Sequence, residues 1–173
     1  SGSLLTDSGQ IPEIEFDGSD DHFNVNFGSD LSQPNTIFMV HQSDTTTDNK
    51  NEFLDREGTS GTPRSLFDQT GSDYRLLANT SGNSGVAIDT NKTLAVALFN
   101  GSSSVLTKNG TSSSAFNAGT QGINQNSEIG RSDGSNGNYD GTMQEFIVYN
   151  SDQSSKRPDL ETNIASHYDI TLS

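Results

Sequence analysis

The sequence contains no cysteine and no tryptophan, and it has few basic residues. Its 173 residues include 9 Lys and Arg against 23 Asp and Glu, which gives a formal net charge of −14. Without cysteine no disulfide framework can form, so the redox compartment cannot be inferred from cysteine pairing. Because phosphate contacts need clustered Lys and Arg, this charge balance argues against a nucleic-acid partner and against binding to an anionic membrane surface.

Long apolar stretches are missing as well. No run reaches the ~18 residues of a transmembrane candidate, so membrane insertion is not expected, and no signal peptide is visible. Only 28% of the residues are hydrophobic, which together with the charge is typical of disordered chains. The apolar residues nevertheless cluster in short periodic runs, and the polar excess is Ser, Thr, Asn and Gly. This composition indicates long loops on a β scaffold.

Short apolar runs separated by turn residues predict about ten β-strands at a spacing of roughly 8–12 residues. In one run Phe23, Val25 and Phe27 alternate with polar residues, and we expect them to point inward. Residues 37–42 are expected to form a central strand, and Asn109-Gly110 marks a hairpin turn. The longest polar segments are expected to be loops: 43–51, 111–127 and 132–140. The pattern predicts an all-β, antiparallel, two-sheet sandwich.

The C-terminal part of the sequence predicts one further strand followed by a short helix. In the strand, alternation places one set of side chains on one face (Met143, Glu145, Ile147, Tyr149) and a second set on the other (Gln144, Phe146, Val148). Apolar residues on both faces suggest that this strand is covered on both sides. In the helix, residues 156–170, Leu160, Ile164 and Tyr168 form one narrow stripe that can dock on a sheet. Ser155 is the expected N-cap, and Pro158 is tolerated in the first turn.

These motifs, in this order, resemble laminin-G-like, concanavalin A-like jelly-roll domains. The matching segments are 14–23, 36–41, 93–110, 129–130 and the closing strand and helix, so the resemblance covers about residues 13 to 170. It implies a jelly-roll β-sandwich with a short C-terminal helix for residues 13–173, with 1–12 as a linker or a remnant of a larger protein. It also implies a phage or marine microbial surface protein, and therefore an extracellular or virion-surface location.

One polar loop combines the residue types that bind sugars and calcium. Five of its residues are candidates for ligand binding: Asp133, Asn136, Asn138, Tyr139 and Asp140. Carboxylate and amide oxygens suit Ca²⁺, and Asn, Asp and Tyr suit sugar hydroxyls. Laminin-G-like domains often carry Ca²⁺ at the rim of the sandwich, so the resemblance makes Asp133 and Asp140 the candidate calcium ligands. The alternative is an Asx-rich turn without a ligand, which is also the simplest interpretation of a second acidic turn at Asp17, Asp20 and Asp21.

Two further sets of residues were considered for catalysis. Glu13, Glu15 and Asp17 alternate and could line one face of a strand, which resembles the carboxylate strand of glucanases that share this fold. We favour an exposed edge strand, because the spacing differs at the third carboxylate and no tryptophan is present to stack on sugars. His22, His41 and His167 are far apart in sequence, and each is expected to be structural or solvent-facing.

The sequence therefore predicts a carbohydrate-binding or adhesion module without catalytic activity. The expected partner is a glycan or a host-surface polysaccharide, bound by the loops that the scaffold holds. A structural or decorating module of a virion, acting through contacts with other virion subunits, is the first alternative. A glycoside hydrolase that uses Glu13 and Glu15 is the second. The sequence leaves a homo-oligomer open.

Overall fold

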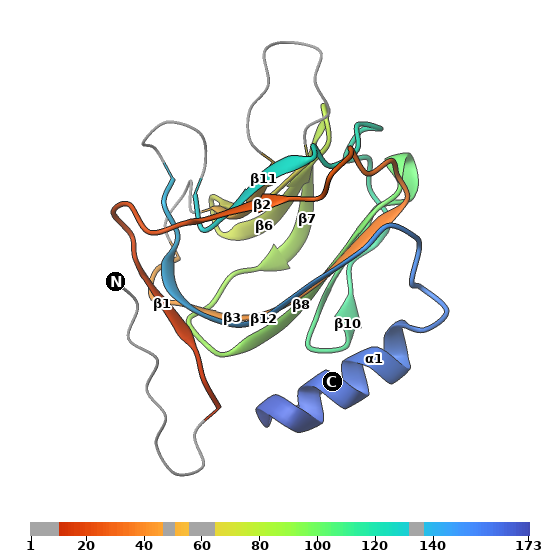
Figure 1. Ribbon diagram of the computed structural model, residues 1–173. Helices are drawn as coiled ribbons and strands as arrows, with labels where there is room; N and C mark the ends of the chain where they lie inside the picture. The colour runs from red at the N-terminus through yellow and green to blue at the C-terminus, as the bar shows by residue number, and fades with distance from the viewer. Residues whose placement is uncertain (1–10, 47–50, 56–64, 132–136) are drawn as a thin grey trace.

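The computed structural model describes residues 11–46, 51–55, 65–131 and 137–173, and for residues 51–55 it describes the backbone alone (Figure 1). Within these ranges the chain forms two six-stranded antiparallel sheets that face each other, with one helix at their side. No helix in these ranges combines the length and the apolar content needed to cross a bilayer. The predicted all-β sandwich with a C-terminal helix is confirmed.

Each sheet is built from strands that are distant in the sequence. Sheet A contains, in spatial order, β1 (Ile14–Asp17), β12 (Asp140–Tyr149), β3 (Asn35–Ser43), β8 (Thr93–Phe99), β9 (Val105–Lys108) and β10 (Thr111–Ser112). Sheet B contains β2 (Phe23–Asn26), β11 (Asn126–Ile129), β4 (Asn51–Asp55), β5 (Leu66–Thr70), β6 (Asp73–Leu77) and β7 (Ser81–Ala87). A 3₁₀ turn, η1 (Gly101–Ser103), follows β8, and α1 (Arg157–Tyr168) follows β12.

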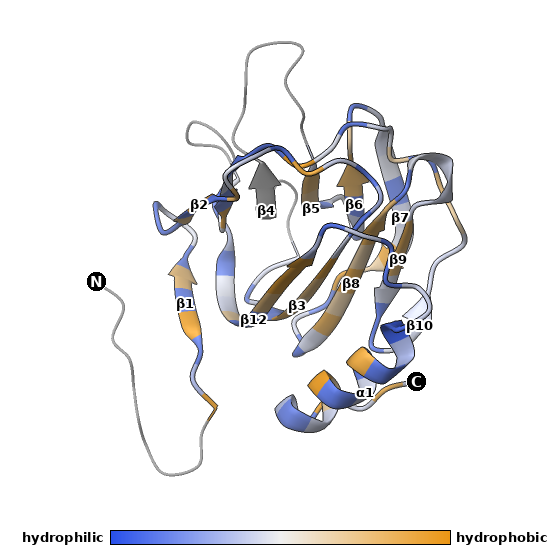
Figure 2. Cartoon of the chain, turned by 45° about the vertical axis from the view of Figure 1, so that its right-hand side comes forward, coloured by the Kyte–Doolittle hydropathy of each residue, from blue (hydrophilic) through white to orange (hydrophobic). Residues whose placement is uncertain are grey.

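Sheet A is buried on both faces because it packs against sheet B on one side and against α1 on the other. In β3, Ile37 and Met39 belong to the core between the sheets, whereas Phe38 and Val40 pack with α1. The same division holds in β8, and the apolar residues of β3 and β8 are orange in Figure 2, above α1. Two hydrophobic cores thus share one sheet, which explains how a chain with few apolar residues buries them effectively.

A β-bulge in β12 changes the predicted facing of one residue. The register with β3 shifts between Met143 and Glu145, so the strict alternation expected from the sequence breaks there. Met143 consequently joins the core between the sheets together with Phe146 and Val148. The prediction that Met143 shares a face with Ile147 and Tyr149 is therefore wrong, since those two residues pack with α1.

The helix begins later than predicted and without a side-chain cap. Its N-cap is Lys156, which makes no capping hydrogen bond through its side chain, so the prediction of Ser155 as N-cap is wrong. The chain is instead turned into the helix by Gln153, whose carbonyl oxygen accepts hydrogen bonds from the backbone N–H groups of Lys156 and Arg157. The predicted stripe is confirmed, because Leu160, Ile164 and Tyr168 all pack on sheet A.

The polar segment 111–127 contains more structure than its sequence indicates. Strand β11, which begins at Asn126, lies between β2 and β4, and Ala118 and Ile123 are fully buried in the core.

Phe23 is more exposed than the sequence pattern predicts. It was expected to point inward, but its side chain is 45% exposed, although its ring centroid lies 5.8 Å from that of Phe16. The Asn109-Gly110 hairpin turn is confirmed, with φ of 47° and 87° at its two residues.

Candidate functional site

The loop proposed for ligand binding lies at one rim of the sandwich, where β12 begins. Asp133 and Asn136 fall outside the described residues. Tyr139 is fully buried, and its hydroxyl lies 3.0 Å from Nδ1 of His41, so its ring belongs to the core. Asn138 is 9% exposed and Asp140 is half-buried. The ligand-binding role of this loop stays a prediction.

The structure brings the two acidic turns of the sequence together at this rim. Asp17 and Asp140 are register partners across β1 and β12, and the side chain of Asp140 packs against Gly18. The amide of Asn138 donates a hydrogen bond to the backbone carbonyl of Ser19. Segments that are more than a hundred residues apart in sequence therefore form one polar surface.

Calcium binding at this rim stays a prediction, because the candidate ligand Asp133 lies outside the described residues. Among the described residues there is no group of three or more His, Cys, Asp or Glu side chains placed to hold a metal. The carboxylate of Asp17 accepts a hydrogen bond from the backbone of Ser19, and that of Asp21 accepts one from the backbone of Asp17. These acidic side chains serve as local turn acceptors.

The carboxylates considered for catalysis lie on an edge strand, as the favoured interpretation predicted. Glu13, Glu15 and Asp17 are all exposed, and β1 is the outermost strand of sheet A. Among the described residues, the amide of Gln144 lies 3.4 Å from Oε2 of Glu13.

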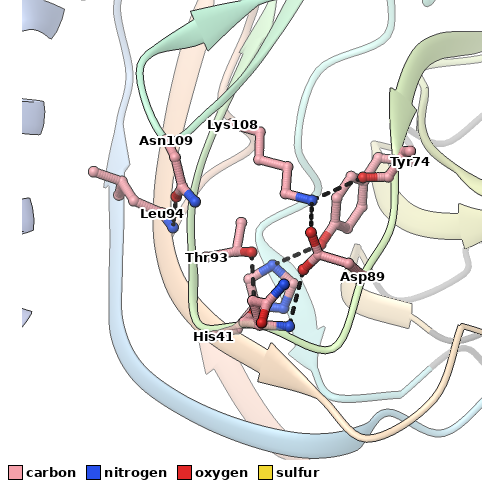
Figure 3. Close-up of polar contacts among 9 residues, drawn as sticks. His41, Tyr74, Asp89, Thr93, Leu94, Lys108 and Asn109 are labelled. Carbon is pink, nitrogen blue, oxygen red and sulfur yellow. Dashed lines mark hydrogen bonds and ion pairs between the residues drawn. The ribbon is translucent and has the colours of Figure 1, made fainter. Parts of the chain in front are cut away.

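The three histidines have separate structural surroundings. His41 is buried between the sheets, where its Nε2 lies 3.3 Å from the hydroxyl of Tyr74. The pKa of His41 is lowered from 6.5 to about 3, mainly by burial and secondarily by the nearby cation of Lys108, with Asp89 acting in the opposite direction. Figure 3 shows these residues, with Nζ of Lys108 bound to Asp89 at 2.7 Å. His22 and His167 are near the surface, so no two histidines form a common site.

Among the described residues, a pocket beside the helix is a candidate site for a ligand. Its volume is about 240 Å³, and it opens on the outer face of sheet A between the β9–β10 hairpin and the start of α1. In Figure 1 these elements lie side by side at the lower right. The lining residues are Thr36, Val96, Leu98, Val105, Thr107, Ser112, Ser113, Gln153, Ser154 and Arg157.

The guanidinium of Arg157 organises the polar wall of this pocket. Its Nη1 donates hydrogen bonds to Oγ1 of Thr107 at 2.7 Å and to Oγ of Ser112 at 3.0 Å. The two hydroxyls also lie 3.0 Å from each other. On the helix, Oε2 of Glu161 is 3.4 Å from the same Nη1. Because each hydroxyl oxygen is accepting from Arg157, the hydroxyl hydrogens remain to donate elsewhere, and one of the two is available to a ligand.

Three apolar side chains form the floor of the pocket, and the lining also includes the side-chain amide of Gln153. Val96, Leu98 and Val105 come from adjacent strands of sheet A, on the face that α1 leaves partly uncovered. The side-chain amide nitrogen of Gln153 donates a hydrogen bond to Oγ of Ser151, at 2.6 Å. The side-chain oxygen, Oε1, therefore remains as an acceptor. An apolar floor with a few placed donors and acceptors is the usual composition of a small-ligand site.

Sequence reasoning missed most of this pocket. Segment 111–127, one of the loops expected to take part in recognition, supplies Ser112 and Ser113 to the lining, and its role in binding stays a prediction. Thr107 and Arg157 gave no signal, since one lies in a strand and the other begins a helix 50 residues later. Only the docking of α1 on sheet A brings them together.

Comparison with solved structures identifies the fold. The chain is similar to a pentraxin from Limulus polyphemus, described as heptameric and SAP-like (TM-score 0.61, 11% identity, 84% of this chain and 78% of that one). It is similar to domains LG4-5 of the mouse laminin α1 chain (TM-score 0.60, 8% identity, 86% of this chain and 46% of that one). It is also similar to domain 4 of an extracellular arabinanase from Geobacillus stearothermophilus, solved with arabinotriose (TM-score 0.61, 11% identity, 86% and 76%).

These similarities establish a concanavalin A-like jelly-roll fold, as the sequence motifs predicted. At identities of this size they establish the fold alone. The chain spans less than half of the laminin fragment. No protein-family model matches the sequence, and no curated protein is significantly similar to it.

Proposed function

We propose that this domain is a carbohydrate-binding module without catalytic activity, and that the pocket between the β9–β10 hairpin and α1 holds one sugar unit. The observation that carries the proposal is the composition of that pocket. Hydroxyl, amide and guanidinium groups surround a floor of Val96, Leu98 and Val105. A sugar ring has the complementary surfaces, with C–H groups on its faces and hydroxyls at its edge.

The size of the pocket agrees with this assignment. Drug-sized ligands occupy pockets of ~300–1,000 Å³. A pocket of about 240 Å³ is smaller, and it suits a single sugar at the end or in the middle of a chain whose other units lie in solvent. The arabinanase domain solved with arabinotriose is an instance of a related sandwich that holds a short saccharide.

The absence of acidic residues from the lining supports a binding role. Glycoside hydrolases generally place two carboxyl groups on either side of the scissile bond. None of the described residues that line this pocket is an Asp or a Glu. The candidate carboxylates Glu13 and Glu15 belong to the region of β1, which lies at the opposite edge of sheet A from β10.

The biological setting is proposed from the sequence resemblance alone. An extracellular or virion-surface location would bring this module to cell-surface or matrix glycans. A structural module of a virion would instead bind no saccharide and would assemble with other subunits. Binding to a glycan distinguishes these two functions directly.

The test is a glycan array followed by calorimetry on any saccharide that binds. Replacing Ser112 or Gln153 by Ala removes one polar group from the pocket wall, and we expect each to weaken binding about 2–10-fold, the effect of one net hydrogen bond. Ser114→Ala is the matched control, because Ser114 is also exposed, lies two residues from Ser112 and does not line the pocket. It should leave the affinity unchanged.

Two outcomes would contradict the proposal. Binding that is lost in Asp140→Ala but unchanged in Ser112→Ala and Gln153→Ala would place the saccharide at the acidic rim instead. The absence of binding to every glycan, together with a stable oligomer in solution, would favour the structural module.

A further inference from the structure

The described lining of the pocket contains one cationic side chain, Arg157, and the polar contacts of this side chain are all made through one nitrogen. Arg157 donates to Thr107 and Ser112 through Nη1, and its ion-pair distance to Glu161 is measured to the same atom. Within the described ranges, Nε and Nη2 of Arg157 make no hydrogen bond. The side chain lines the pocket and is 27% exposed, so part of it is open to solvent.

We propose that the sugar bound here carries a carboxylate, as a hexuronic acid does, and that the Nε–Nη2 edge of Arg157 binds this carboxylate. This inference rests on the proposed function. These two N–H groups are parallel and coplanar. Two parallel N–H donors match the two oxygens of a carboxylate in a bidentate arrangement, and such charged hydrogen bonds are about twice as strong as neutral ones. A neutral hydroxyl would use only one of the two donors.

The surrounding contacts hold Arg157 in place for this role. Hydrogen bonds to β9 and β10 fix the guanidinium from the sheet, and Glu161, one helical turn further along α1, fixes it from the helix. Glu161 is 3% exposed, so its carboxylate is covered and is not itself a competitor at the pocket mouth. A preorganised guanidinium loses little freedom when a ligand binds, which favours affinity.

The charge of the whole chain restricts which anions can bind. Arg157 is the one Lys or Arg among the described residues that line the pocket, and the chain carries a net charge of −14. A densely sulfated or phosphorylated polyanion would be repelled by that field, whereas a sugar with a single carboxylate can be neutralised by a single guanidinium. The site therefore suits a sugar with one carboxylate better than a densely sulfated one.

Calorimetry with matched monosaccharides tests the inference. The probes are the methyl glycosides of glucuronate, galacturonate and mannuronate, each compared with its methyl ester and with the corresponding 6-sulfated hexose. We expect at least one acid to bind about tenfold more tightly than its ester, since the ester lacks the charged pair of equivalent oxygens that engages both donors, and at least as tightly as its sulfated counterpart. Arg157→Gln should lower the affinity for the acid to that for the ester.

Two further variants separate charge from geometry. Lys156→Gln removes the same charge from the neighbouring exposed residue, which does not line the pocket, and it should leave the preference unchanged. Arg157→Lys keeps the charge but loses the planar pair of donors, and it should lose most of the preference for the acid. This variant also serves if Arg157→Gln does not fold.

The outcomes distinguish this inference from the proposed function on which it rests. Equal binding of acid and ester, with Ser112→Ala still weakening both, overturns the carboxylate inference and leaves the carbohydrate-binding function intact. Tighter binding of the sulfated hexose also overturns it. A failure of every acidic and neutral saccharide to bind overturns both.

Discussion

The hydroxyl of Tyr168, at the last turn of α1, lies 2.8 Å from Oε2 of Glu145 on β12 and 3.1 Å from the backbone carbonyl of Gln144. Both acceptors sit at the β-bulge that follows Met143. Glu145 shares the helix-facing side of β12 with Ile147 and Tyr149, and the tyrosine hydroxyl fixes the helix to the irregular part of the strand. Tyr168 thus binds both residues of the bulge, Gln144 through its backbone carbonyl and Glu145 through its carboxylate.

Tyr168→Phe should destabilise the domain by about 1–2 kcal/mol. The substitution keeps the ring, which is 6% exposed, and removes the hydrogen bond to a carboxylate, an interaction stronger than one between neutral groups. Urea unfolding at pH 7 measures the change. His167→Phe is a suitable control because His167 is exposed, and it should change the free energy of unfolding by less than about 0.5 kcal/mol. Equal effects of the two variants would contradict the assignment.

The same residue predicts a loss of stability at high pH. Burial, followed by the hydrogen bond to Glu145 and the negative charge of that residue, raises the pKa of Tyr168 from 10 to about 12. Since the folded pKa lies above the unfolded one, this contribution is fully present below pH 10 and is lost as the pH rises from about 10 to 12. Urea unfolding across this range should show a shallower decline in Tyr168→Phe than in the native protein. Parallel curves would argue against it.

His41 predicts a loss of stability at low pH. Burial is the main cause that lowers its pKa from 6.5 to about 3, so the folded protein holds this imidazole neutral while the unfolded chain protonates it. The contribution is present above pH 6.5 and is lost as the pH falls toward 3, with an upper limit of about 5 kcal/mol. NMR of the histidine rings should show no titration of His41 between pH 7 and pH 5. A midpoint near pH 6 for that ring would refute the prediction.

Gly119→Ala should be far more damaging than Gly28→Ala. Both glycines have positive φ, +92° and +78°, so each substitution incurs a backbone strain of about 1–2 kcal/mol. A Cβ at Gly28 would meet nothing within 4 Å, whereas a Cβ at Gly119 would lie 1.9 Å from the carbonyl oxygen of Ala78. We expect Gly119→Ala to lose ~3 kcal/mol or more, or to fail to fold. Thermal unfolding of the two variants makes the comparison, and similar melting temperatures would contradict it.

Much of the sandwich could be predicted because its signals are local. The continuous apolar runs of β3 and β8, the Asn109-Gly110 turn and the stripe of Leu160 and Ile164 each depend on residues close together in sequence. Strand β11 could not be predicted in the same way. Its residues, Asn126 to Ile129, are mostly polar, and they form a strand because β2 and β4 provide hydrogen-bonding partners on both sides.

The residues of the candidate site could be predicted from local sequence even less well than strand β11. The sequence by itself determined the fold type, the docking stripe of the helix and the polar character of segment 111–127, since periodicity and turn chemistry are properties of neighbouring residues. Only the tertiary structure decided that Tyr139 belongs to the core and that Arg157 meets Thr107 and Ser112. The physical reason is that a pocket is made by contacts between distant segments, and those contacts exist only after both faces of sheet A have been covered.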